Sequence, residues 1–291
     1  MECKRVTTGL QDALREVLAD WESDLSSDWR PVIDGVELAF DAVDGALELH
    51  PWEPIFPSRR HVELPGEPDG AHMFRAFDNL PPQSVRCVVV GQDPYPKIAF
   101  STGRAFESGE HRHWRELNNM RSHSMRCLIQ SLYAFRSGRP AHAEDVEGWP
   151  ATLEAVAAPK NGFPAPAELA QSWVDQGVLL LNASLTLSRF AVDGDPHQTR
   201  GHLPLWHPLI ERILRYFAGG AGRPVAFMLF GEAAQRAATS SGIVEPAAVH
   251  DHPAIVASPH PAEGNGFFEQ SNPFERCNSK LLAMGAAPIH W

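Results

Sequence analysis

The sequence predicts an α/β protein with three layers, α/β/α, built around a central four-stranded parallel sheet. Four short apolar runs carry this prediction, because each has the length and the aliphatic composition of a strand that is buried on both faces. Stretches with helical periodicity separate the runs, and strands that alternate with helices are typical of parallel sheets with right-handed crossovers. The expected strands cover residues 87–90, 178–181, 225–230 and 254–257.

The expected helices follow from the spacing of apolar residues and from the glycines and prolines at their ends. The first covers about 9–25, where five apolar residues repeat at helical spacing: Leu10, Leu14, Val17, Leu18 and Trp21. In the helix expected over 205–218, Pro208 fits only the first turn, because proline lacks an N–H. Further helices are expected over 124–135, 167–175, 233–239 and 274–284.

The length and composition predict a globular protein. A chain of 291 residues suffices for one large domain or two small ones, and we expect a single domain over 1–291. Within it we expect an N-terminal helical extension over about 1–50 and an insertion within 107–166. The hydrophobic fraction of 43% supports a sizeable core. No apolar run could span a membrane and the N-terminus lacks an apolar signal core, so we expect a cytoplasmic protein without membrane contact.

The charged residues and cysteines narrow the classes of function. The four cysteines are scattered and form no C-x-x-C pair, so neither a metal site nor a cofactor is expected. The net charge of −11 argues mildly against a nucleic-acid partner. The middle of the chain is nevertheless basic, with seven arginines and three acidic residues between 104 and 139. This stretch fits either a solvated surface or a flank that faces phosphates.

Polar residues follow the expected strands at the points where they end. Asp93 comes after the first strand, Asn182 after the second and His260 after the fourth. Parallel strands bring these ends to one edge of the sheet, where open α/β proteins bind their ligands. Each residue alone also fits a duller role as a turn residue, a loop cap or a hydrogen-bonded loop histidine. Their coincidence at three strand ends favours a common site, with Tyr95 and Phe106 as aromatic walls.

The motifs around these residues resemble the uracil-DNA glycosylase superfamily, most closely its uracil-N-glycosylase branch (family 1), over roughly residues 55–291. Gly91-Gln92-Asp93-Pro94-Tyr95 resembles the water-activating motif of that branch, and Gly103-Arg104-Ala105-Phe106 resembles the segment with its uracil-stacking phenylalanine. The stretch 173–182 resembles the helix and strand that deliver the uracil-reading asparagine. His260-Pro261 resembles the start of the DNA-intercalation loop. Several separate motifs in matching order make the resemblance specific.

The resemblance implies a monomeric, monofunctional DNA repair enzyme that needs no cofactor. Such an enzyme hydrolyses the N-glycosidic bond of deoxyuridine in DNA, releases uracil and leaves an abasic site. The resemblance gives catalytic roles to Asp93, beneath the sugar C1′, and to His260, which would donate to uracil O2. Roles in substrate binding fall to Gln92, Tyr95, Phe106 and Asn182. Among them, the tyrosine would exclude the thymine methyl group, the phenylalanine would stack on the flipped base, and the asparagine would distinguish uracil from cytosine.

The chain departs from the family in the parts that handle DNA. Pro96 stands where the branch usually has histidine, and Glu232 stands where it commonly has serine. The loop after His260 is shorter, and Gly264 takes the place of the usual leucine wedge. We expect DNA contacts at Pro261, Ala262, Gly264, Arg112, Arg115, Arg121 and Arg126.

Two explanations for the missing wedge stay open. The protein acts on single-stranded DNA or loosened pairs, or the insertion at 107–166 supplies the grip on double-stranded DNA. In either case we expect poor binding of a DNA-mimic protein inhibitor that grips the leucine wedge. Alternative functions are a uracil- or abasic-site-binding protein without turnover, a glycosylase for another damaged base, and a small-molecule hydrolase on the same sheet.

Overall fold

The computed structural model describes residues 7–119, 123–190, 194–219, 223–244 and 253–291. Its main sheet has four parallel strands in the order β4-β3-β5-β6, which confirms the predicted α/β fold. The strands are β3 (Cys87–Gly91), β4 (Val178–Asn182), β5 (Ala226–Phe230) and β6 (Ala254–Ser258). Three of them end one residue later than the sequence predicts, and β5 begins one residue later.

Strands β3, β4 and β5 are buried along their whole length, as their continuous apolar composition requires. The edge strand β6 alternates between buried and half-buried residues. The β3–β4 and β5–β6 pairs continue to the last residue of each strand, where Gly91 lies opposite Asn182 and Phe230 lies opposite Ser258. The loops that follow the strands therefore start side by side.

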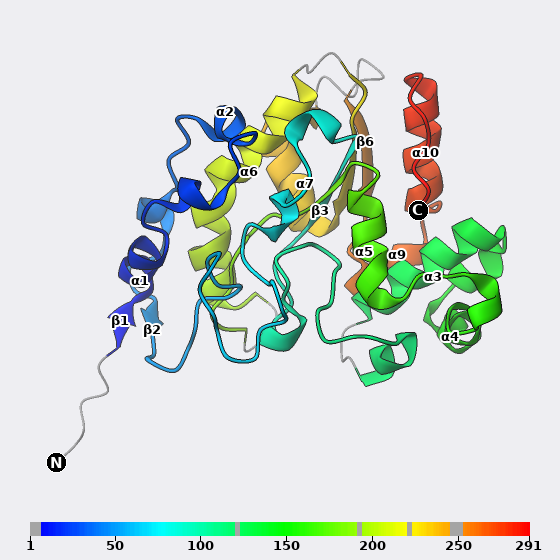
Figure 1. The fold of residues 1–291 in the computed structure, drawn as a ribbon, viewed down its shortest axis with the longest axis horizontal. Coiled ribbons are helices and arrows are strands. Elements are labelled where there is room, and N and C mark those ends of the chain that lie inside the picture. The colour runs from blue at the N-terminus through cyan, green and yellow to red at the C-terminus, as the bar shows by residue number, and fades with distance from the viewer. Residues whose placement is uncertain (1–6, 120–122, 191–193, 220–222, 245–252) are drawn as a thin grey trace.

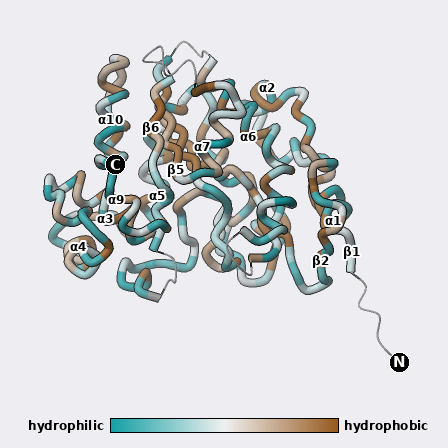
Figure 2. The backbone as a smooth tube through the Cα atoms, turned by 180° about the vertical axis from the view of Figure 1, so that it is seen from behind, coloured by the Kyte–Doolittle hydropathy of each residue, from teal (hydrophilic) through white to brown (hydrophobic). Residues whose placement is uncertain are grey.

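Helices cover both faces of the sheet (Figure 1). One group contains α6 and α7, which contact each other. In the other group, Trp173 of α5 packs on Phe274 of α10, and Cys277 of α10 lies against Cys87 of β3. In Figure 2 the hydrophobic strands β5 and β6 lie between these helices. The helices are α3 (Ser124–Ser137), α5 (Pro166–Val174), α6 (Leu203–Ala218), α7 (Gly231–Ser240) and α10 (Pro273–Ala283).

The predicted helix over 9–25 is too long. The α-helix α1 covers only Leu10–Val17 and is followed by a separate 3₁₀ turn at Trp21–Asp24. Asp20 takes a left-handed conformation between them, with a φ of 52°. This break turns the Trp21 ring onto Phe74, where the two rings stack at 5.8 Å.

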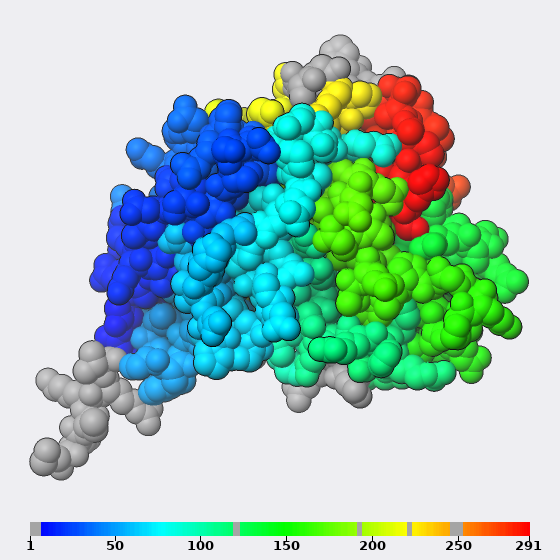
Figure 3. Space-filling view, viewed as in Figure 1, coloured from blue at the N-terminus to red at the C-terminus, as the bar shows by residue number. Residues whose placement is uncertain are grey.

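Residues 7–50 pack against the rest of the protein. Helix α2 (Arg30–Ile33) contacts α6, and the two short strands β1 (Thr8–Gly9) and β2 (Glu48–Leu49) pair with each other. The indole of Trp29 is fully buried and donates to the Leu80 carbonyl oxygen. In Figure 3 this segment, in blue, lies directly against the cyan segment.

In the segment 107–166, most of the described residues lie in α-helices or 3₁₀ turns. Besides α3 it contains α4 (Trp149–Val156) and several 3₁₀ turns. The short helix α9 (Asn265–Phe268) lies beside it, and the Val146 N–H donates to the Asn265 side chain at 2.9 Å. The 3₁₀ turns of the chain include Phe40–Ala42, Arg75–Phe77, Pro82–Ser84, Ile98–Phe100, Trp114–Asn119, Pro140–Ala143, Val146–Gly148, Pro159–Asn161 and Pro261–Glu263.

A π-helical turn at His197–His202 leads into α6. The helix therefore begins at Leu203, two residues before the predicted start, and Pro208 lies in its second turn. The prediction that Pro208 belongs to the first turn is wrong. Its ring lies on the half-exposed side of the helix, away from the buried face. No helix in the described part of the chain is both long and apolar enough to cross a membrane.

We expect Gly103→Ala to destabilise the protein by about 3 kcal/mol. Gly103 has a φ of +98°, and an added Cβ would lie 1.9 Å from the His72 carbonyl oxygen. Urea unfolding measures the change. Gly45→Ala is the matched control, because its Cβ would meet nothing within 4 Å, and it should stay within about 0.5 kcal/mol of the wild type. Equal stability of the two variants would contradict the expected strain at Gly103.

Candidate active site

A cleft of about 590 Å³ opens at the carboxyl ends of the four strands. It is lined by residues from the loops after β3, β4, β5 and β6 and from the π-helical turn before α6. All of the predicted catalytic and substrate-binding residues line it: Asp93, His260, Gln92, Tyr95, Phe106 and Asn182. The structure thus brings together in one cavity the residues that the sequence places at separate strand ends.

Asp93 lies just beyond β3, and its carboxylate accepts a hydrogen bond from the side-chain amide of Gln198. Gln198 belongs to the π-helical turn and is 1% exposed. The backbone at this strand end is held by β4, because the Ala183 and Ser184 N–H groups donate to the carbonyl oxygens of Gly91 and Gln92, both at 2.9 Å. A carboxylate is therefore fixed at the floor of the cleft.

Asn182 ends β4 and is 3% exposed. Its side chain lies over Gly91, where an added Cβ would be 2.7 Å from the Asn182 Oδ1 and 3.5 Å from the Phe106 ring. Glycine at this position therefore lets the amide and the ring approach the strand end. The Phe106 ring packs edge-to-face on Phe230 at 5.1 Å and lies 6.2 Å from the His260 ring.

Tyr95 forms another wall of the cleft. Its ring packs edge-to-face on Phe100 at 6.5 Å. Burial of the hydroxyl raises the pKa of Tyr95 to about 12, and the nearby Ser124 side chain opposes part of this effect. The side chain is therefore a neutral phenol throughout the physiological pH range.

His260 lies in the loop after β6, and its hydrogen bonds and its pKa define the tautomer of its ring. The Ala262 N–H donates to its Nδ1 at 3.1 Å. Burial lowers the pKa of His260 below its usual value, and the nearby Glu263 carboxylate opposes part of this effect. A neutral ring whose Nδ1 accepts must carry its proton on Nε2. His260 therefore offers one N–H donor to the cleft.

The backbone around His260 is also fixed. The Glu263 carboxylate accepts from the His260 N–H at 2.7 Å and closes a capping box over the 3₁₀ turn Pro261–Glu263. Gly231, the first residue after β5, leaves room for the ring, because a Cβ there would lie 2.8 Å from the His260 Cβ.

The residues expected to contact DNA are not gathered in one place. Pro261 is buried, whereas Ala262 is exposed and lines the cleft. Gly264 has a φ of 64°, and a Cβ added there would lie 3.4 Å from the Val146 side chain, so the turn lies beside the 107–166 segment. Arg112 and Arg115 are exposed and Arg126 is half-buried, and none of the three lines the cleft. Arg121 lies outside the described residues.

Sequence reasoning missed several residues of the cleft. Gln198 is the most important, because it contacts Asp93 directly. Arg104 is buried, lines the cleft and donates to Gln171 at 3.1 Å. Glu232, which the sequence marks only as a departure from the family pattern, also lines the cleft, and its carboxylate pairs with Arg236 at 2.7 Å. The neighbourhood of Gly194 and Gln198 could have been suspected because it is a polar, Gly- and Pro-containing stretch after a strand end.

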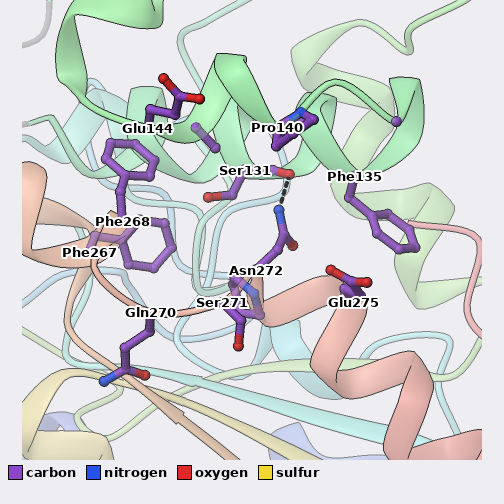
Figure 4. A pocket seen from close by; sticks show the side chains of 14 residues that line it. Ser131, Phe135, Pro140, Glu144, Phe267, Phe268, Gln270, Ser271, Asn272 and Glu275 are labelled. Carbon is purple, nitrogen blue, oxygen red and sulfur yellow. Dashed lines mark hydrogen bonds between the residues drawn. The ribbon is translucent and has the colours of Figure 1, made fainter.

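A second cavity, of about 700 Å³, lies between α3, α9 and the start of α10 (Figure 4). Phe135 and Phe268 point into it, and Glu144 and Glu275 lie at its rim. It shares no lining residue with the cleft at the strand ends. Across the described ranges, no group of three or more His, Cys, Asp or Glu side chains is placed to hold a metal ion.

Known proteins resemble this chain over most of its length. No protein-family model matches it. The uracil-DNA glycosylase of Mycolicibacterium vanbaalenii is 32% identical over 228 residues, which are 77% of this chain and 80% of the relative. This chain belongs to the uracil-DNA glycosylase family. The uracil-DNA glycosylase of Lacticaseibacillus casei is 29% identical over 272 residues, which cover 92% of this chain and 94% of the relative.

Solved structures of uracil-DNA glycosylases share the fold. The wild-type UNG of Nitratifractor salsuginis has a TM-score of 0.57 and 22% identity, and the match covers 91% of this chain and 94% of that one. The mimivirus uracil-DNA glycosylase has a TM-score of 0.59 and 16% identity, over 100% of this chain and 95% of that one. A mimivirus UNG variant with a TM-score of 0.60 was solved in complex with UGI.

In this uracil-DNA glycosylase family member, we expect Glu263→Gln to lower the pKa of His260 further. The glutamine keeps an oxygen that accepts from the His260 N–H, but it removes the negative charge that favours the imidazolium. A histidine-ring NMR titration measures the change, with the His260 signal identified by its absence from His260→Gln. A pKa that rises in Glu263→Gln would contradict this assignment of causes.

Proposed function

We propose that this protein hydrolyses the N-glycosidic bond of deoxyuridine in DNA, releases uracil and leaves an abasic site. One observation carries the proposal: a fixed carboxylate, a neutral imidazole N–H and a buried amide face one cleft with aromatic walls. Membership of the uracil-DNA glycosylase family supports it. We assign Asp93 and His260 to catalysis and Gln92, Tyr95, Phe106 and Asn182 to substrate binding.

Asp93 acts on the sugar. When the bond between C1′ and N1 breaks, positive charge develops on the sugar and negative charge on the departing base. A carboxylate beneath C1′ stabilises the cation and orients the water that attacks it. At about 4 Å and an effective dielectric constant near 20, one pair of unit charges is worth roughly 4 kcal/mol, or about three decades of rate.

His260 acts on the base. As uracil leaves, negative charge gathers on its O2, and a donor that is already in position stabilises this charge without reorganisation. The Nε2–H of the neutral ring is such a donor, because the Ala262 N–H occupies the Nδ1. Removal of one donor of this kind typically lowers the rate by about 10²–10³-fold.

Asn182 and Tyr95 select the base. The carboxamide of Asn182 can accept from uracil N3–H and donate to O4, and cytosine reverses both partners, so the fixed amide disfavours it. We assign the Tyr95 ring to the wall that would stand against C5 of the base and exclude the methyl group of thymine. Phe106 offers a face on which the flipped base stacks. These roles make a glycosylase for thymine or guanine lesions a weaker alternative.

The departures in the DNA-handling loop support an enzyme that acts without a leucine wedge. Gly264 has no side chain to act as a wedge, and the capping box holds the 3₁₀ turn before it in a compact form. Extrusion of a base from a duplex costs a few kcal/mol, and a base in a single strand is already free of its pair. We therefore propose a preference for single-stranded DNA or loosened pairs. We also propose that the enzyme is monomeric and cytoplasmic.

The first test is release of uracil from an oligonucleotide with one deoxyuridine, followed by cleavage of the abasic product with alkali. We expect Asp93→Asn to lower the rate by about 10³-fold while DNA binding persists. Asp34→Asn, an exposed residue after α2, is the matched control and should keep full activity. Uracil-specific binding without an abasic product would favour the non-catalytic alternative. Cleavage of free uridine but not of DNA would favour the small-molecule hydrolase.

The second test compares strand preference. We expect faster excision from single-stranded than from matched double-stranded substrate, because Gly264, at the place of the usual leucine wedge, has no side chain to fill the place of the flipped base. Equal rates on both substrates would contradict this proposal. For the same reason we propose that a DNA-mimic inhibitor such as UGI binds poorly, and stoichiometric inhibition at equal concentrations of the two proteins would contradict that.

A further inference from the structure

We infer that Gln198 is a positioning residue for Asp93 in the reaction proposed above. Its side-chain amide holds one oxygen of the Asp93 carboxylate, so that the ionised carboxylate keeps one orientation beneath the sugar. The inference rests on the proposed function, because Gln198 acts through Asp93. It adds a residue from a different element of the fold to the catalytic machinery.

The contact joins two elements that are far apart in the sequence. Gln198 Nε2 donates to Asp93 Oδ2, across 105 residues of chain. The glutamine is 1% exposed, so its amide is shielded from water and the carboxylate is a strong acceptor for it. A hydrogen bond to the ionised form of a carboxylate also favours that form over the protonated one.

The backbone that carries Gln198 is held from both sides. The turn His197–His202 is π-helical, a rare form that often occurs at functional sites. Asp195 fixes its start, because its carboxylate accepts from the His197 N–H and its carbonyl oxygen accepts from the Thr199 N–H, both at 2.9 Å. The first and last residues of the turn, His197 and His202, are 2% and 0% exposed.

A chain of buried hydrogen bonds locks these two histidines. The Trp206 indole donates to Thr186 Oγ1 at 2.7 Å, and Thr186 Oγ1 bonds to His202 Nδ1 at 2.8 Å. The His202 Nε2 and the His197 Nδ1 each lie 2.9 Å from Ser188 Oγ. Burial lowers the pKa of His202 to about 3, so this ring stays neutral and its hydrogen bonds do not change across the working pH range. These hydrogen bonds thus fix the turn that presents Gln198.

The test uses two variants of nearly equal size and follows kcat and KM against pH. Gln198→Leu removes the donor, and we expect kcat to fall about ten- to hundredfold with little change in KM, since misplacement of one catalytic group costs about this much. We also expect the acid limb of its rate profile to move about one pH unit upward, because the carboxylate loses a bond that favours its ionised form.

Gln198→Glu gives the sharper result. At low pH, one shared proton lets the new carboxyl group donate to Asp93 as the amide does. At higher pH both groups ionise and repel each other, so we expect activity to fall as the pH rises, the reverse of the wild type. Among the described residues, the other titratable or charged side chains that line this cleft are Tyr95, Arg104, Glu232, Arg236, His260 and Glu263, and both variants leave them unchanged.

Arg200→Gln is the matched control. Arg200 lies on the same turn but pairs with Asp44 on the surface, so the variant should keep the wild-type profile. Thermal unfolding of each variant checks that the fold persists. A rising, wild-type-like pH profile in Gln198→Glu, or an unchanged kcat in Gln198→Leu, would overturn the inference. Absence of uracil release by the wild type would instead overturn the proposed function, so the two failures are distinguishable.

Discussion

The site depends on the pairing of β3 with β4, which continues to the last residue of each strand. Gly91 lies opposite Asn182, and the absence of a Cβ at position 91 is what lets the asparagine amide and the Phe106 ring approach the strand end. Asp93 follows two residues later, so its place is set by the same pairing. The pairing of β5 with β6 brings Gly231 under His260 in the same way. The positions of the site residues are thus set by the strand pairing at the carboxyl end of the sheet.

Much of this could be predicted from the sequence, because buried parallel strands leave a strong signal. The three consecutive valines before Gly91 identify β3, and the strand ends alone bring Asp93, Asn182 and His260 to one edge. Gln198 could not be found this way. A π-helical turn has no hydrophobic period of its own, and the contact with Asp93 spans two elements whose relative placement depends on buried side chains. The left-handed Asp20, which breaks the predicted first helix, likewise has no clear sign in the sequence.

In this acidic protein, whose net charge is −11, some arginines stabilise the fold and others are exposed on the surface. Several of them donate to main-chain carbonyl oxygens inside the molecule, as Arg59 does to Val17, Arg212 to Val32 and Arg276 to Ala257. These guanidinium groups join segments that are distant in the chain. The basic stretch around 104–139 divides in the same way, since Arg104 is buried against Glu107 while Arg112 and Arg115 are exposed. A count of charges along the sequence therefore overstates the positive surface open to phosphates.

The hydrogen bond that fixes the His260 ring comes from the main chain at Ala262. Any amino acid with a backbone N–H can make this bond, so the identity of residue 262 is free to drift through evolution while the tautomer of the histidine is kept. Proline is the single exception among the common amino acids. In the proposed reaction, the loop expected to contact DNA can thus be remodelled at its exposed position, and its affinity for different strand structures can be selected, without altering the His260 proton assigned to departure of the base.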